Sequence, residues 1–271
     1  MRLSRREFLM AGTGIVVFPP AQTRTGRTML LKACINGARQ AGVHPALPTT
    51  PAAMASAAAA SIAAGAGAVH LHVRGPDRSE SLNASDVAST LTAVRAAIRS
   101  VPVGVSTGLW IVGDPEKRQA LVSAWSVLPD FASVNFNEAR SPALASLLID
   151  RGVGVEAGLP TAAAAEELAR SGLGPRCLRI LIEPQGRDVA VALGIVRDIE
   201  AILDRTGIMR PRLLHSSGAA AWPVIDEAAR RGYDTRAGLE DTLEMPDGRS
   251  APDNAAIVAE AKRRIARAVA P

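Results

Sequence analysis

The sequence predicts an α/β fold, a single-domain (β/α)8 TIM barrel that occupies residues 29–271. Short apolar runs alternate eight times with longer stretches rich in Ala, Leu, Glu and Arg, which is the pattern of strands that are each followed by a helix. The chain has 271 residues and is 48% hydrophobic, so it is long enough for one large core and near the usual length of such a barrel.

The strands are expected at 30–36, 68–73, 103–106, 131–136, 154–156, 177–182, 212–215 and 235–240. The helices are expected at 51–64, 84–99, 115–125, 142–151, 161–171, 189–206, 222–231 and 254–269. Thr50-Pro51 and Ser141-Pro142 support two helix starts, because an N-cap residue before a first-turn proline is typical there. An open doubly wound sheet is the alternative, but residues 36–39 lack the Gly-rich nucleotide turn that usually follows its first strand.

Residues 1–28 are interpreted as a leader that lies outside the barrel. Residues 4–9 read SRREFL, a twin-arginine pattern that precedes a short apolar run and resembles a Tat export signal. Pro19 and Pro20 end that run early, and no convincing A-x-A cleavage site follows. The alternative is that translation begins at Met29, just before the first strand.

Composition excludes several classes of protein. The net charge is +5, from 31 basic and 26 acidic residues; the leader holds five arginines and one glutamate, so it contributes +4 and leaves +1 for the rest. Without a basic stripe in the body, no nucleic-acid surface is expected. No apolar run reaches the roughly 20 residues of a membrane span. Cys34 and Cys177 lie in apolar runs and are interpreted as packing thiols.

Two histidines at a spacing of two stand out in the second expected strand. His70 and His72 would point to the same face of that strand, where they could bind one metal ion or simply line a packed interior. Glu240 is the candidate third ligand, since zinc often takes a carboxylate beside two imidazoles. Arg236 is expected on the same strand face as Glu240, and Asp241 at the start of the following loop. The two segments could together form a metal site with a neighbouring carboxylate base.

Other polar residues are expected at the C-terminal ends of the strands, where the active sites of such barrels gather. These residues are Arg39, Ser106, Thr107, Asn135, Asn137, Glu156, Glu183 and His215. Asn135 and Asn137 are expected to share a strand face that could hydrogen-bond a substrate. Trp110, Trp125 and Trp222 are interpreted as structural.

Eight segments carry a resemblance to a known family: ACINGAR, HPALPTTP, AGAGAVHLHVR, GVSTGLW, ASVNFNE, RILIEP, AWPVIDEA and DTRAGLEDTL. In that order they cover nearly everything after the leader, and the chain resembles the β-keto acid cleavage enzymes, whose best-known type is the 3-keto-5-aminohexanoate cleavage enzyme. The resemblance implies a zinc-dependent TIM barrel in which His70, His72 and Glu240 hold Zn²⁺.

The resemblance also implies a reaction and its partners. A β-keto acid and acetyl-CoA would be converted to acetoacetate and a new acyl-CoA by enolate formation, Claisen-type condensation and cleavage. Ser106 and Thr107 would hold the substrate carboxylate, and Asp241, positioned by Arg236, would remove the C2 proton. We expect a homo-oligomer, although the sequence does not give the number of subunits.

Arg39 marks a departure from the aminohexanoate-cleaving type, which has a glutamate here that grips the substrate amine. A cation at this position would repel an ammonium group and favour a neutral or anionic tail. Glu156 is expected at the rim, facing the tail or paired with Arg39.

Two alternatives remain open at this point. One is a metal-dependent retro-aldolase or hydrolase on the same barrel, which would need no CoA; the other is a non-catalytic exported binding protein. Because acetyl-CoA is a cytoplasmic metabolite, we expect a cytoplasmic protein, with periplasmic location by Tat export as the alternative.

Overall fold

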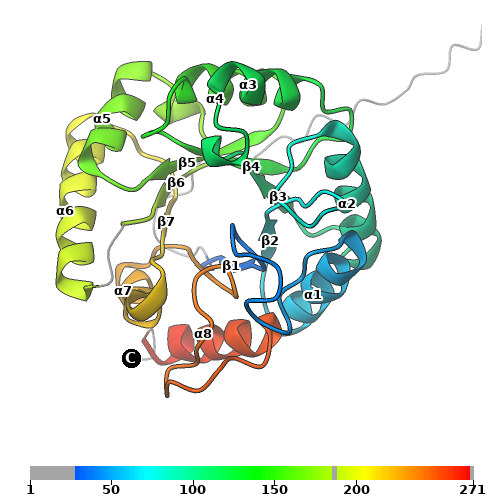
Figure 1. Ribbon diagram of the computed structural model, residues 1–271. Helices are drawn as coiled ribbons and strands as arrows, with labels where there is room; N and C mark the ends of the chain where they lie inside the picture. Colours follow the sequence, from blue (N-terminus) through cyan, green and yellow to red (C-terminus); the bar gives the residue numbers. More distant parts are fainter. Residues whose placement is uncertain (1–27, 185–187, 269–271) are drawn as a thin grey trace, which may run out of the picture.

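A ring of eight parallel strands surrounded by helices forms the body of the protein (Figure 1). The computed structural model describes residues 28–184 and 188–268. The leader assigned to residues 1–28, with its twin-arginine pattern, therefore lies outside the described residues except for Thr28. No helix within the described ranges is long and apolar enough to cross a membrane.

The strands are β1 (Leu31–Cys34), β2 (Ala68–Leu71), β3 (Val103–Ser106), β4 (Phe131–Asn135), β5 (Gly154–Leu159), β6 (Arg179–Ile182), β7 (Arg212–Leu214) and β8 (Thr235–Ala237). The helices are α1 (Pro51–Ala63), α2 (Ala84–Ala97), α3 (Pro115–Ser123), α4 (Ser141–Asp150), α5 (Ala162–Ser171), α6 (Val189–Arg205), α7 (Ala221–Arg231) and α8 (Asn254–Ala268). Short 3₁₀ turns lie at Leu109–Ile111, Gly174–Arg176 and Gly218–Ala220.

The strand order confirms the predicted barrel. Neighbouring strands follow one another along the chain from β1 to β7, and β8 pairs in parallel with β1 on its other side. The ring is completed between β7 and β8 by a parallel bridge from Leu213 to Asp234 and by the Leu214 amide, which donates to the Asp234 carbonyl oxygen at 2.9 Å. An open doubly wound sheet is excluded, because such a sheet would not pair its first strand with its last.

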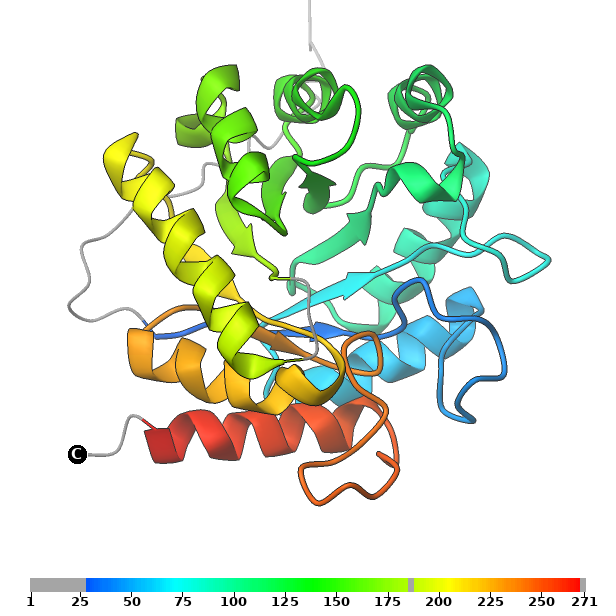
Figure 2. The same ribbon diagram turned by 60° about the vertical axis from the view of Figure 1, so that its left-hand side comes forward.

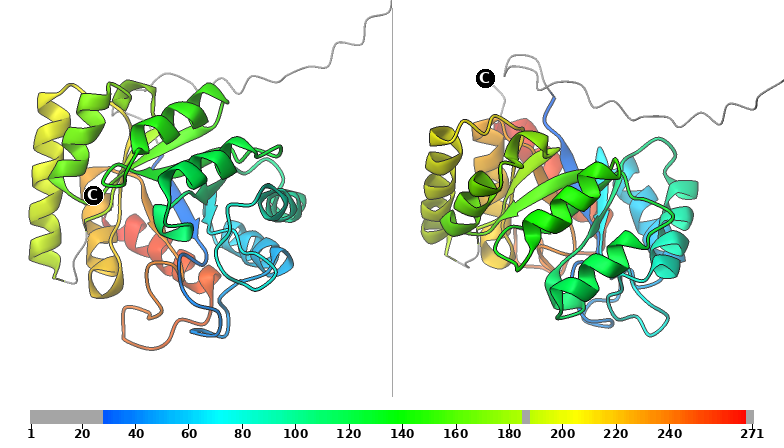
Figure 3. Two further views of the ribbon diagram at one scale, coloured as in Figure 1. Left: turned by 45° about the horizontal axis from the view of Figure 1, so that its top comes forward. Right: turned by 90° about the horizontal axis from the view of Figure 1, so that it is seen from above.

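Local sequence signals account for most helix starts. Thr50 and Thr161 accept hydrogen bonds from backbone amides three residues later, at 3.2 and 3.3 Å, as N-cap residues do. Ser141 is an exception to the prediction: α4 begins at Ser141 itself, and its N-cap is Arg140 in the left-handed region with φ of 56°. Helices α5 and α6 pack side by side on one flank, and α8 packs against both α1 and α7 (Figures 1 and 3).

Five strands end earlier than the sequence predicts, namely β1, β2, β4, β7 and β8, and the ends of β2 and β8 matter most for the site. β2 ends at Leu71, so His72 lies just beyond it, and β8 ends at Ala237 rather than at Glu240. The chain turns at Gly238, although the alternating pattern of the sequence continues past this residue and predicted a strand as far as Glu240. The loops that follow β1, β2 and β8 project on the same side of the barrel, which brings their side chains together (Figure 2).

Glu156 does not lie at the rim, and this prediction was wrong. β5 continues to Leu159, so Glu156 is in the middle of a strand and its side chain is fully buried inside the barrel. There it forms ion pairs with Lys32 and with Arg179, whose Nε lies 3.1 Å from Glu156 Oε1. Its partners are thus Lys32 and Arg179, and not Arg39.

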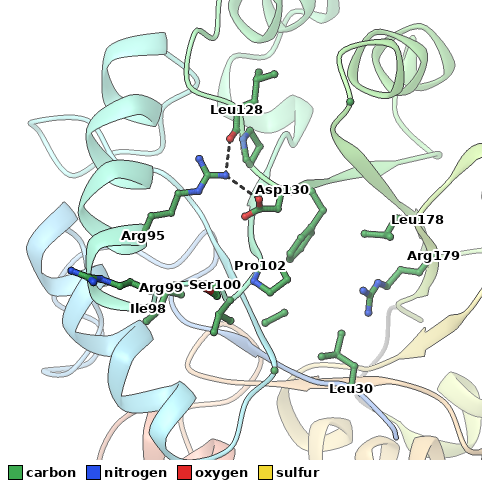
Figure 4. Close-up of a pocket in the computed structure, with 16 residues that line it drawn as sticks. Leu30, Arg95, Ile98, Arg99, Ser100, Pro102, Leu128, Asp130, Leu178 and Arg179 are labelled. Atoms are coloured by element: carbon green, nitrogen blue, oxygen red, sulfur yellow. Dashed lines mark hydrogen bonds and ion pairs between the residues drawn. The ribbon is translucent and has the colours of Figure 1, made fainter. Parts of the chain in front are cut away.

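A cavity of about 820 Å³ lies at the opposite end of the barrel from these loops. Residues that precede or begin the strands line it, among them Leu30, Pro102, Asp130 and Arg179 (Figure 4). Arg95 from α2 donates to the Leu128 carbonyl oxygen and pairs with Asp130 at its edge. Because active sites of such barrels form at the other end, we locate the site from its side chains and not from this cavity.

Candidate metal centre and active site

The two histidines of the β2 segment converge with a carboxylate from the other side of β1. His70 Nε2 lies 3.9 Å from Glu240 Oε2, and His72 Nε2 lies 3.6 Å from Glu240 Oε1. One ligand atom from each residue can be chosen so that all lie within 4.8 Å of one another. Both histidines are almost completely buried, with 1% and 5% of their surface exposed. Two imidazoles and one carboxylate form a donor set that suits a divalent transition metal.

Close packing at two glycines brings Glu240 into this position. The Glu240 amide donates to the Cys34 carbonyl oxygen at 3.2 Å, which fixes the turn after β8 against β1. A Cβ on Gly238 would lie 2.0 Å from that same oxygen, so only glycine fits there. Gly37, at φ of 60°, packs directly against the side chain of Glu240. The sequence predicted that Arg236 and Glu240 lie along one strand face, and this was wrong: β8 ends at Ala237, and the two side chains meet across a turn.

One buried arginine holds two carboxylates beside each other. Arg236 Nη2 donates to Glu240 Oε1 at 2.8 Å and to Asp241 Oδ1 at 2.6 Å. Burial alone would raise the pKa of Glu240 and of Asp241, but Arg236 and the neighbouring histidines more than offset it and hold both pKa values below their ordinary range. Both acids are therefore ionised near neutral pH, and the three side chains together carry one net negative charge.

Each acid keeps one buried oxygen that is free to bind something else. Glu240 Oε2 and Asp241 Oδ2 have no hydrogen-bond partner within residues 28–184 and 188–268. His215 lies beside this pair, with Nδ1 3.5 Å from Asp241 Oδ1 and Nε2 3.4 Å from Glu183 Oε2. Unpaired buried carboxylate oxygens are costly, so their presence indicates a site that binds a cation or a polar ligand.

Glu80 is a site residue that sequence analysis missed. Its Oε1 lies 2.5 Å from His72 Nδ1, on the side of the ring that faces away from Glu240. Burial lowers the pKa of His72, but Glu240 and Glu80 outweigh burial and raise it to about 9. The surroundings of His72 therefore favour positive charge. Glu80 is eight residues away in the chain, and no spacing rule connects it to the histidine pair.

Arg74 ties the loops around the histidines together. The Arg74 side chain is buried, with 5% of its surface exposed. Its Nη2 donates to the Gly37 carbonyl oxygen and to the Arg39 carbonyl oxygen, the latter at 2.9 Å. Its Nη1 donates to the Arg78 carbonyl oxygen at 3.3 Å. The arginine of the HVR segment thus joins the β1 and β2 loops. This contact holds the segment that packs against Glu240.

The remaining predicted residues surround the site at different depths. Ser106 ends β3, buried, and accepts from the Gly108 amide at 3.3 Å, while Thr107 donates its hydroxyl to the Ser133 carbonyl oxygen at 2.7 Å. Arg39 is half-buried, and its Nε donates to the Leu239 carbonyl oxygen in the turn that carries Glu240.

The sequence predicted that Asn135 and Asn137 share a strand face, and this was wrong. β4 ends at Asn135, whose Nδ2 donates to Glu138 Oε1 at 3.0 Å, and Asn137 is exposed in the following turn. The expected alternation failed because the chain bends directly after Asn135. Glu138 is in turn held by the buried Arg118.

Solved structures with similar folds confirm the barrel. A binary complex of ObcA with oxaloacetate is 19% identical with a TM-score of 0.66, over 81% of this chain and 63% of that one. A ternary complex of ObcA with a C4-CoA adduct and oxalate is 18% identical with a TM-score of 0.69, over 82% of this chain and 64% of that one. This chain thus spans less than two thirds of the ObcA chains. The tryptophan synthase α subunit of Legionella pneumophila str. Paris is 13% identical with a TM-score of 0.56, over 88% of this chain and 93% of that one.

Sequence comparison identifies the family. No curated protein matches this chain. The family model described as beta-keto acid cleavage enzyme matches residues 28–170 and 196–270, which include both histidines, Arg236 and the Glu240-Asp241 pair. This protein therefore belongs to the beta-keto acid cleavage enzyme family.

Proposed function

We propose that the protein is a zinc-dependent enzyme that converts a β-keto acid and acetyl-CoA to acetoacetate and a new acyl-CoA. The observation that carries the proposal is the convergence of His70, His72 and Glu240 beside Asp241, with Arg236 joined to both acids. A metal site next to a fixed, ionised carboxylate is the arrangement that proton removal beside a ketone requires.

The residues fit a zinc ion. Glu240 Oε2 is buried without a hydrogen-bond partner in the described part of the chain, and it faces His70 Nε2 at 3.9 Å. Two imidazole nitrogens and one carboxylate oxygen would leave a coordination position open for substrate. When bound there, zinc would supply a Lewis acid for the keto oxygen of the substrate.

Asp241 is the proposed base. Arg236 binds its Oδ1, which fixes the orientation of the carboxylate, while Oδ2 is buried and has no partner among the described residues. This free oxygen accepts the C2 proton of the β-keto acid. Because Asp241 is almost completely buried, few water molecules compete with the substrate for this oxygen.

Ser106 is the proposed main donor to the substrate carboxylate. Its oxygen accepts from the Gly108 amide, which leaves the hydroxyl hydrogen free to donate. Thr107 uses its hydroxyl hydrogen on the Ser133 carbonyl oxygen, so it contributes less as a donor in this arrangement. Asn135 and Asn137 remain candidates for hydrogen bonds to the substrate, and Arg39 is the proposed contact to its tail.

The carbon–carbon chemistry follows from the family. The C2 carbanion of the β-keto acid attacks the acetyl carbonyl carbon, and the CoA thiolate leaves. The thiolate then adds to the original keto carbon, and the bond between C2 and that carbon breaks, which leaves the electron pair on C2. The protonated Asp241 returns its proton to C2, and acetoacetate and the new acyl-CoA separate. The ObcA structure with a C4-CoA adduct supports the view that a barrel of this kind can hold a CoA-linked carbon chain.

The test measures acetoacetate formation by zinc-loaded protein from a panel of β-keto acids, with and without acetyl-CoA. Product that depends on acetyl-CoA supports the proposal. Turnover without acetyl-CoA would instead support a metal-dependent retro-aldolase or hydrolase, and no turnover of any β-keto acid would overturn it.

Asp241→Asn is the first variant to measure in that assay. We expect kcat to fall about 100- to 10,000-fold, because the general base is lost, while zinc affinity stays near that of the wild type. The matched control is Asp198→Asn on the exposed face of α6, which should leave kcat unchanged. Equal kcat in Asp241→Asn and wild type would remove Asp241 as the base.

A further inference from the structure

The Glu80 carboxylate joins two aromatic rings at the mouth of the site. Its Oε1 lies 2.5 Å from His72 Nδ1, and its Oε2 accepts from Trp110 Nε1 at 2.9 Å. The Trp110 indole also stacks on the His72 imidazole, with ring centroids 6.2 Å apart and planes inclined by 26°. We call these three residues the His72–Glu80–Trp110 clasp. Each member contacts the other two.

A tight hairpin in the loop after β2 positions Glu80. The Gly75 amide donates to the Ser79 carbonyl oxygen at 2.9 Å, and Arg74 forms an antiparallel bridge with Glu80. Arg78 takes the left-handed conformation, φ of 67°, at the tip. The hairpin returns the chain so that Glu80 lies beside His72. A strained tip is a cost that the contacts of Glu80 must offset.

The loop after β3 brings Trp110 to the same carboxylate. The indole lies so close to Gly108 that a Cβ there would come within 2.2 Å of it. Trp110 is nevertheless 50% exposed, so core packing does not explain its position. Its hydrogen bond to Glu80 and its stacking on His72 do. The interpretation of Trp110 as merely structural thus misses its contact with a candidate metal ligand.

The clasp determines which nitrogen of His72 is free. The Glu80 carboxylate accepts from both rings through its two oxygens, so Nδ1 carries the hydrogen that Glu80 accepts. In the neutral imidazole that binds a metal, the lone pair is then on Nε2, which faces Glu240 Oε1 at 3.6 Å. By contrast, His70 Nδ1 is buried with no hydrogen-bond partner in the described residues. Of the two candidate histidine ligands, His72 is therefore the one whose second ring nitrogen, Nδ1, is held by a hydrogen bond.

We propose that Glu80 and Trp110 are positioning residues that fix the ring and tautomer of His72 for metal binding, and that they join the β2 and β3 loops at the mouth of the site. The proposal rests on the metal site of the proposed function, but not on the identity of the substrate. It assigns roles to two residues that touch neither the ion nor the reacting atoms. Partners of this kind are typically worth 10- to 100-fold in metal affinity.

Glu80→Gln is the main test. Glutamine has nearly the same size but only one acceptor oxygen, so it cannot accept from both rings. With full-length protein freed of metal, competition against a chromophoric chelator should give a Zn²⁺ affinity about 10- to 100-fold weaker than in the wild type. The visible spectrum of the Co²⁺-loaded protein should also change, because it reports the geometry of the ligands. Glu116→Gln, an exposed glutamate on nearby α3, is the control and should leave both readouts unchanged.

Trp110→Phe supplies an independent readout. In the wild type, Zn²⁺ should change the tryptophan emission, because the half-exposed indole is stacked on a ligand ring. Trp110→Phe should lose that change, because the two remaining tryptophans, Trp125 and Trp222, are buried and do not stack on a candidate ligand. The variant should also weaken Zn²⁺ binding severalfold. This variant retains Glu80 and so tests the clasp even if Glu80→Gln folds poorly.

The outcomes separate the clasp from the metal site. If Glu80→Gln and Trp110→Phe bind Zn²⁺ as tightly as the wild type while His72→Ala loses binding, the clasp is refuted and the metal site stands. If His72→Ala also binds as tightly as the wild type, the metal site itself is refuted. Weaker Zn²⁺ binding in both clasp variants with an unchanged Glu116→Gln control supports the proposal.

Discussion

Arg39 is the residue at which the family resemblance implies a departure from the aminohexanoate-cleaving type. Its Nε donates to the Leu239 carbonyl oxygen, and no other described residue forms a hydrogen bond with its guanidinium group. The side chain is thus anchored at one edge next to the turn that carries Glu240. Its remaining N–H groups are available to a neutral or anionic substrate tail.

Reversing this charge should change substrate preference. Arg39→Glu is expected to shift the ratio of kcat/KM values toward β-keto acids with amino-bearing tails, because the ammonium group then meets an opposite charge. The measurement is kcat/KM for a matched pair of β-keto acids whose tails end in ammonium and carboxylate. Arg249→Glu, on an exposed side chain, serves as the control. An unchanged ranking of the pair would place Arg39 outside the tail pocket.

At the scale of elements, the turn after β8 decides whether the site forms. Gly238 lies against the Cys34 carbonyl oxygen, and Asn254 at the start of α8 accepts from the Leu239 amide at 2.8 Å. The same asparagine donates to the Ile35 carbonyl oxygen at 2.9 Å. The turn is therefore fixed to β1 and to α8 at once, and both acids of the site depend on it.

Gly238→Ala should disturb this turn. A Cβ 2.0 Å from a backbone oxygen forces the strands apart, so we expect the free energy of unfolding to fall by about 1–3 kcal/mol or more, together with weaker Zn²⁺ binding. Urea denaturation and chelator competition measure the two effects. Gly194→Ala within α6 has room for the methyl group and should instead stabilise by about 0.5–1 kcal/mol. Equal stability of Gly238→Ala and wild type would contradict this account of the turn.

Elements differ in how far the sequence predicts them. Helix starts at Thr50 and Thr161 were predictable, because their N-cap bonds are local. The end of β8 was not, since the side-chain alternation continues past Gly238 and only the contact with Cys34 reveals the turn. Glu80 could not be predicted from spacing, because a hairpin closed by backbone hydrogen bonds carries it to His72.

At the scale of the whole molecule, the interior of the barrel contains a buried ionic network. Lys32 from β1, Glu156 from β5 and Arg179 from β6 are joined across the barrel, and Arg179 continues to Asp234 at 3.2 Å. The eightfold alternation of the sequence predicted the barrel itself. It could not predict that Glu156 lies inside, because the burial of a charge depends on partners distant in the chain.

Breaking this network from one side should be costly. Glu156→Gln leaves Lys32 buried without an acid, so we expect a loss of about 3–5 kcal/mol in the free energy of unfolding. The double variant Lys32→Met with Glu156→Leu should lose less than the sum of the two single variants, because neither charge remains uncompensated. Urea denaturation of the wild type, Lys32→Met, Glu156→Leu and the double variant completes the cycle. Additive losses would indicate that the two residues do not interact.

Cys177 should report opening of the whole barrel. Burial raises its pKa to about 12, so at pH 8 the folded protein has almost no thiolate, whereas an unfolded cysteine with a pKa of about 8.5 has a substantial fraction. Iodoacetamide should therefore label Cys177 only as fast as the protein opens, and urea should accelerate labelling. Mass spectrometry of the peptide that contains Cys177 measures the rate. Rapid labelling in buffer at full native stability would show that the thiol is accessible.

The candidate metal ligands lie at the end of β2 and in the turn after β8, two strands that flank β1 on both sides and are far apart in the chain. An ion held by His70, His72 and Glu240 would therefore act as a staple across the seam between β1 and β8, the first and last strands of the barrel. A ribosome must complete β8 and the turn after it before such a staple can form. Metal loading would then be a late event in the biogenesis of this protein, and the loaded form would resist opening at that seam more than the metal-free form.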